Sequence, residues 1–149
     1  MTLMQQLGWG SLYLTFCLLI ETAILVACIS ALKSLAVRVV GKNESFANTI
    51  ILLVSLMFIL LSHTVQIWIW AVVFLWTNAL PDWNTSIYFS LITYTSLGYG
   101  DVVLGEGLRI FGGFAAITGL LGFGISTAFV VAVVGRIFGI GNPHSLGKE

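Results

Sequence analysis

Three long runs of apolar residues limit what this chain can fold into more than any other feature of its sequence. They span residues 12–32, 46–76 and 108–140, and each is long enough for a membrane-crossing helix, which takes about 20 mostly apolar residues. A fourth run, 85–96, has only about a dozen residues and predicts a re-entrant or buried helix. All four runs are continuously apolar and lack the alternation of membrane strands, so we expect helices and not a β-barrel.

The composition excludes several classes of protein. Of the 149 residues, 58% are hydrophobic and 8% are charged, whereas soluble domains carry about 25% charged residues. The chain cannot cover a globule with polar side chains, and it is too apolar for intrinsic disorder. Its formal net charge is +0, so we expect no binding of nucleic acid. A nucleophile–base pair, a zinc cluster and a phosphate loop are all missing, which predicts that the protein is not an enzyme.

The basic residues predict how the runs are oriented in the membrane. Between the first two runs lie Lys33, Arg38 and Lys42. Arg136 and Lys148 follow the core of the last long run. Because Lys and Arg stay on the cytoplasmic side, three spans place the N-terminus outside and the C-terminus in the cytoplasm. We therefore expect a multi-pass protein of the plasma membrane whose short run enters from outside.

A glycine-containing segment directly follows the short run. It reads Leu97-Gly98-Tyr99-Gly100-Asp101. Non-helical backbone at membrane depth has to be buried in protein or line water. Gly98 and Gly100 can adopt backbone angles that are closed to other residues, so successive carbonyl oxygens of this strand can point the same way. A ring of such carbonyls can replace the hydration shell of a monovalent cation, and a ring requires several copies of the chain around an axis.

These residues give the chain a resemblance to the pore domain of tetrameric potassium channels. The family pattern reads roughly T-x-T-T-x-G-Y-G-D, and this chain has Thr93-Tyr94-Thr95-Ser96-Leu97-Gly98-Tyr99-Gly100-Asp101. The resemblance runs from about residue 85 to residue 136, and more loosely back through the second long run. It implies an all-α membrane protein with three transmembrane helices, a re-entrant pore helix and a selectivity filter, assembled as a homotetramer in the lipid bilayer.

The resemblance also implies which atoms hold the permeant K+ ions. Ser96 would offer its hydroxyl and carbonyl oxygens, and Leu97, Gly98 and Tyr99 would offer carbonyls. Gly100 would close the outer mouth of the filter. Two positions depart from the pattern, since Ser96 stands where threonine is usual and Leu97 where valine or isoleucine is usual.

Five neighbouring positions match residues that support the filter in this family. Thr95 precedes the filter, and Tyr99 would turn its ring away from the pore and brace the filter against the pore helix. Asp101 would anchor the filter from behind. Tyr88 and Phe89 stand where many members carry a pair of aromatic residues that form a cuff around the filter.

The same resemblance divides the chain into three parts. Residues 1–44 would form an extra N-terminal transmembrane helix and a basic cytoplasmic loop. Residues 45–141 would form the ion-channel pore domain, with outer helix, pore helix, filter and inner helix. Residues 142–149 would be a short cytoplasmic tail, too short for a soluble ligand-binding domain.

Three residues inside the long runs are further candidates. Gly119 falls where the inner helix of the family often carries a hinge glycine, and close helix packing is the alternative reason for a small residue there. Glu21 and His63 are ionisable groups deep in apolar runs, where such groups are costly and functional candidates by default. Their matching depths predict a hydrogen bond or ion pair, which would serve either as a structural pin or as a proton sensor.

We expect the protein to be a subunit of a potassium-selective channel, and three other functions stay open. A weakly selective monovalent cation channel is compatible with the departures at Ser96 and Leu97. A non-conducting accessory subunit would use the glycine-containing segment only as a loop that closes a helical hairpin. A proton-coupled transporter would use Glu21 and His63.

Overall fold

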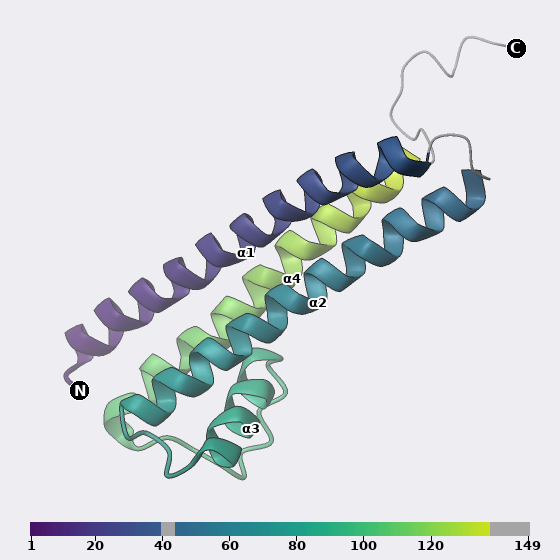
Figure 1. Ribbon diagram of the computed structural model, residues 1–149. Helices are drawn as coiled ribbons and strands as arrows, with labels where there is room; N and C mark the ends of the chain where they lie inside the picture. Colours follow the sequence, from purple (N-terminus) through teal and green to yellow (C-terminus); the bar gives the residue numbers. More distant parts are fainter. Residues whose placement is uncertain (40–43, 138–149) are drawn as a thin grey trace, which may run out of the picture.

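A computed structural model describes residues 1–39 and 44–137, and this part of the chain is helical with no strand. Its elements are α1 (Leu3–Val39), α2 (Glu44–Trp76), α3 (Trp83–Tyr94), the short 3₁₀ helix η1 (Glu106–Leu108) and α4 (Arg109–Ile137). Figure 1 shows α1, α2 and α4 as a bundle of three long helices, with α3 at the end of the bundle where the N-terminus lies. The predicted all-α architecture is therefore confirmed.

Three of the described helices are long and apolar enough to cross a membrane. α1, α2 and α4 have 37, 33 and 29 residues, and at about 1.5 Å per residue each exceeds the hydrocarbon core of roughly 30 Å. The chain is thus a multi-pass membrane protein. Lys33 and Arg136 both lie toward the end of the bundle that is remote from α3, whereas Lys42, Lys148 and the predicted tail 142–149 fall outside the described residues.

Local hydrogen bonds set the two ends of the short helix α3. Its N-cap is Asp82, whose carboxylate accepts from the Thr85 backbone N–H at 3.0 Å and from the Thr85 hydroxyl at 2.8 Å. At the other end, the backbone N–H groups of Leu97 and Gly98 both donate to the Ile92 carbonyl, at 2.8 and 3.0 Å. These bonds satisfy a carbonyl that the helix leaves open. The helix therefore ends at Tyr94, two residues before the end of the apolar run that predicted it.

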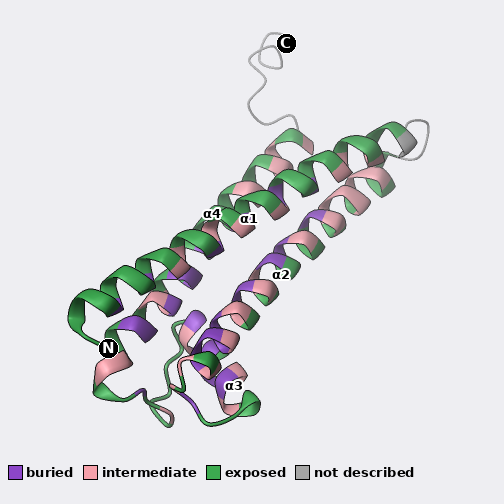
Figure 2. Cartoon of the chain, turned by 60° about the vertical axis from the view of Figure 1, so that its left-hand side comes forward, coloured by how far each residue is buried: buried purple, intermediate pink, exposed green. Residues whose placement is uncertain are grey.

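The apolar core is concentrated at the α3 end of the bundle. Four aromatic rings meet there with centroid distances between 5.2 and 6.2 Å, namely Trp70, Phe74, Phe89 and Phe111. In Figure 2 the buried residues lie on the faces that the helices turn toward one another, and much of the outward surface is exposed. The core thus fixes α3 against α2 and α4, which positions the segment that follows α3.

Helix α1 packs closely along both α2 and α4 and is part of the same bundle. A Cβ atom on Gly10 would overlap the Phe114 ring of α4, so only glycine allows this approach. The buried Gln6 side chain accepts a hydrogen bond from the Phe111 backbone N–H at 3.3 Å, which satisfies an open donor at the start of α4. α2 begins at Glu44, and the division of the chain after residue 44 stays a prediction.

Candidate functional site

Residues 96–100 leave α3 as irregular backbone, and all of them are exposed in the single chain. The backbone angle φ is positive at every second residue, with values of 59° at Ser96, 49° at Gly98 and 79° at Gly100. When residues with positive φ alternate with residues with negative φ, successive peptide planes rotate relative to each other. Their carbonyl oxygens can then point to the same side of the strand. Glycine adopts this conformation at little cost, which explains two of the three positions.

The positive φ of Ser96 gives a physical reason for its departure from the family pattern. A non-glycine residue with φ of 59° is uncommon, and a β-branched residue there is an outlier. Threonine is β-branched and stiff at its first side-chain torsion. Serine therefore fits this backbone better than the threonine that the pattern would place there.

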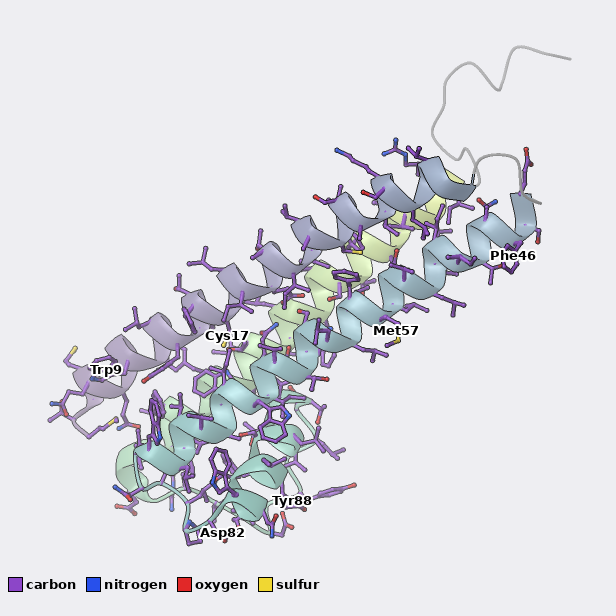
Figure 3. The ribbon with its side chains drawn as sticks, in the orientation of Figure 1. Trp9, Cys17, Phe46, Met57, Asp82 and Tyr88 are labelled. Carbon is purple, nitrogen blue, oxygen red and sulfur yellow. The ribbon has the colours of Figure 1, made fainter. Side chains whose placement is uncertain are left out.

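A hydrogen bond between Tyr88 and Asp101 ties the C-terminal end of the segment to α3. The Tyr88 hydroxyl donates to Asp101 Oδ2 at 2.6 Å, and the Val102 backbone N–H donates to Asp101 Oδ1 at 3.0 Å. The Tyr88 hydrogen bond is the main reason that the pKa of Asp101 is lowered, because it favours the ionised carboxylate. Figure 3 places Tyr88 and the capping Asp82 at the α3 end of the bundle. Asp101 thus anchors the segment, with Tyr88 as its partner.

Replacing Tyr88 with phenylalanine should raise the pKa of Asp101 back toward its ordinary value of 3.8. A carboxyl whose pKa is lowered by folding stabilises the fold above its ordinary pKa, and this contribution is lost as the pH falls through the lowered value. Acid should therefore disturb the segment at a higher pH in Tyr88→Phe than in the wild type. An NMR titration of the Asp101 carboxyl measures the shift. Asp82, whose lowered pKa depends on Thr85, is the internal control, and an unchanged Asp101 titration would contradict the anchor.

Other predicted supports are placed differently. Phe89 is 8% exposed and packs edge-on against Phe74 at 5.2 Å, so within one chain it belongs to the core, and the two-residue cuff stays a prediction. Adjacent helical residues point in different directions at 3.6 residues per turn, which separates it from Tyr88. Tyr99 is 69% exposed, so its ring does not brace the segment within one chain. The Thr95 hydroxyl donates to the Leu91 carbonyl at 2.8 Å and supports the end of α3.

Gly119 of α4 lies directly against the last residue of α3. A Cβ atom at this position would overlap the Tyr94 carbonyl oxygen and would lie 2.8 Å from the Tyr94 carbonyl carbon. Glycine is thus required here by close packing on the backbone that leads into the segment. α4 is a continuous helix through this point, and the hinge role of Gly119 stays a prediction.

A family model described as ion channel matches residues 50–136, more than half of the chain. The chain belongs to this ion channel family. No curated protein and no solved structure matches it. The matched region of this channel subunit begins in α2, includes α3 and residues 96–100, and ends one residue before the end of α4. The role that the family description names is that of an ion channel, and α1 lies outside the match.

A buried polar cluster of the channel lies where α1, α2, α3 and α4 meet. Glu21 accepts hydrogen bonds from the Ser126 hydroxyl at 2.9 Å and from Gln66 Nε2 at 3.1 Å. Ser126 Oγ also lies 3.1 Å from His63 Nε2, and His63 Nδ1 lies 2.8 Å from the Tyr94 hydroxyl. Glu21, Gln66 and Tyr94 are fully buried. The cluster therefore links the helix outside the family match to the last residue of α3.

The predicted direct bond between Glu21 and His63 is wrong, because the Ser126 hydroxyl bridges them. Their predicted proximity is confirmed in this indirect form. Sequence reasoning missed Ser126, Gln66 and Tyr94 as cluster members. Gln66 stands three residues after His63, a spacing that places both on one face of α2 and could have indicated it.

Proposed function

We propose that the chain is one subunit of a homotetrameric, potassium-selective channel of the plasma membrane. K+ would pass down its electrochemical gradient through a ring of oxygens from Ser96, Leu97, Gly98 and Tyr99, with Gly100 at the outer mouth. The observation that carries the proposal is the alternating positive φ along residues 96–100, directly after a short helix and inside the region that matches the ion channel family. Rings of backbone carbonyls are the known filter chemistry for K+.

Exposure in the single chain supports an assembly of several copies. Residues 96–100 are all exposed, and non-helical backbone at membrane depth must be covered by protein or line a water-filled path. Copies arranged around an axis would cover the outer sides of these strands and turn their carbonyls toward the ion. A second copy would also supply the packing partner that the exposed Tyr99 ring lacks in its own chain.

The distribution of charge supports the proposed orientation. Lys33 and Arg136 lie toward one end of the bundle, whereas Asp82 and Asp101 lie at the α3 end. Since Lys and Arg remain on the cytoplasmic side, the filter segment would face outside, together with the N-terminus.

Reversal potentials of the purified protein in a planar bilayer test this function. With K+ on one side and Na+ on the other, we expect a potential displaced toward the K+ equilibrium value, by about 59 mV for each tenfold preference. A reversal potential near zero would indicate a weakly selective cation channel. The absence of any current would favour a non-conducting accessory subunit, and saturable, proton-driven uptake would favour a transporter.

A further inference from the structure

The hydrogen bonds of the polar cluster have a fixed direction. The Ser126 hydroxyl has one hydrogen, which it donates to Glu21 Oε1 at 2.9 Å. Toward His63 Nε2, 3.1 Å away, the Ser126 oxygen can then only accept, so Nε2 carries a hydrogen. In a neutral imidazole the other nitrogen is an acceptor, and the Tyr94 hydroxyl donates to it over 2.8 Å. The hydrogen bonds from Tyr94 through His63 and Ser126 to Glu21 are therefore all donated in the same direction.

A proton added to His63 interrupts this series at Tyr94. An imidazolium donates through both nitrogens, so the Tyr94 oxygen would have to accept and its own hydrogen would lose its acceptor. Tyr94 is fully buried, and within the described residues its hydroxyl bonds only to His63. Because a buried donor without an acceptor is costly, protonation of His63 weakens its contact with Tyr94.

Tyr94 is held between this contact and α4, close to the proposed filter. It is the last residue of α3 and stands two positions before Ser96. A Cβ atom on Gly119 would overlap its carbonyl oxygen, and one on Gly122 would lie 3.1 Å from its hydroxyl. With so little free space, a shift of the Tyr94 side chain moves the backbone that leads into the filter segment.

Glu21 is the carboxylate of the cluster, and no Lys or Arg of the described residues hydrogen-bonds to it. The titratable groups that face Glu21 are Cys17 one turn away on α1, His63 on α2 and Tyr94 on α3, and α4 contributes the uncharged Ser126. A buried carboxylate without a permanent cation beside it is costly, and a proton on His63 would balance its charge.

Two further observations agree with a site for a proton. The Lys and Arg residues of the described ranges stand toward helix ends, away from the cluster, namely Lys33, Arg38, Arg109 and Arg136. Gln66 Oε1 is buried and has no hydrogen-bond partner in the described part of the chain. The cluster thus holds a spare hydrogen-bond acceptor.

We propose that Glu21, Ser126 and His63 form a proton-binding site, and that a proton bound there releases Tyr94 and lowers K+ flux through the filter segment. The effect on flux rests on the function proposed above, whereas the proton site does not. Neutral His63 holds Tyr94 in place at alkaline pH. Acidification through the range from about pH 8 to 5, in which histidine takes up its proton, weakens that contact and reduces the flux.

The test measures K+ flux and melting temperature of the full-length protein, reconstituted in liposomes, between pH 8 and pH 5. His63→Gln is the main variant, because a glutamine can still hydrogen-bond in the cluster but does not titrate. Ser126→Ala removes the hydroxyl that bridges Glu21 and His63, and it changes the side chain by only one oxygen atom. The matched control is Thr127→Ala, since the neighbouring Thr127 hydroxyl is outside the cluster and donates to the Phe123 carbonyl at 2.7 Å.

We expect wild-type flux to fall about fivefold or more over the pH range in which histidine is protonated, with a change in melting temperature over the same range. His63→Gln should lose both pH dependences, Ser126→Ala should shift their midpoints, and Thr127→Ala should retain the wild-type profiles. A His63→Gln profile equal to that of the wild type would overturn the proposal, as would a wild type with no pH dependence in either measurement. A wild type without flux, whose melting temperature still depends on pH through His63, would support the proton site and count against the proposed channel function.

Discussion

Gly100→Ala should lose most of its K+ flux, because alanine disfavours the backbone conformation that the filter segment needs. Gly100 has φ of 79°, and the structure shows nothing within 4 Å of a Cβ atom built there. The effect is therefore conformational and not steric within the chain. An L-residue in left-handed conformation costs roughly 1–2 kcal/mol, and the proposed tetramer would incur that cost in every subunit. Since about 1.4 kcal/mol corresponds to a factor of ten, the population of intact filters should fall by well over tenfold.

Gly105→Ala is the matched control for this prediction. Gly105 stands in the same loop with φ of −58°, and a Cβ atom there also meets nothing within 4 Å. Alanine adopts this φ without strain, so flux into liposomes should stay near the wild-type level. Equal flux from Gly100→Ala and Gly105→Ala would show that the left-handed conformation at residue 100 is not needed for conduction.

Gly119→Ala should destabilise the protein and impair conduction together, because α4 contacts the end of α3 at this residue. The added methyl group would overlap the Tyr94 carbonyl oxygen, which belongs to backbone and cannot rotate aside. Overpacking of this kind costs about 1–3 kcal/mol, and relief requires α3 and α4 to move apart. A lower melting temperature and reduced K+ flux are the expected measurements.

Gly113→Ala provides the comparison, since it lies on the same helix and its Cβ atom would meet nothing within 4 Å. It should keep the wild-type melting temperature. A Gly119→Ala variant as stable as Gly113→Ala would contradict the close packing. Because of this contact, an alanine at residue 119 changes both the packing of α4 on α3 and the ability of α4 to bend. A gating hinge at Gly119 therefore has to be tested by direct observation of helix bending.

The sequence predicted the number, order and type of the major helices because membrane spans are defined by apolar length. The short α3 was predicted in the same way, and Asp82 explains where it begins. Exact bounds were harder. α1 begins at Leu3 and not near residue 12. The helix continues through polar residues before the apolar run, and the length of an apolar run does not predict helix there.

The contacts of the site were only partly predictable. Glu21 and His63 were identified from their depth, but Ser126 lies 105 residues from Glu21 and its role depends on how each helix is rotated about its axis. Helices that are apolar all round do not reveal by periodicity which face is buried. Tyr94 stands among the residues of the glycine-containing motif, and nothing in that pattern indicates that its hydroxyl bonds to His63.

We propose that residues 96–100 of four chains form one carbonyl-lined filter, and a structure of the assembled protein in K+ solution tests this arrangement most directly. We expect four copies around a single axis, with ion density on that axis between Ser96 and Gly100 and carbonyl oxygens directed toward it. An assembly without four-fold symmetry, or a four-fold assembly with no ion density between these residues, would contradict the account.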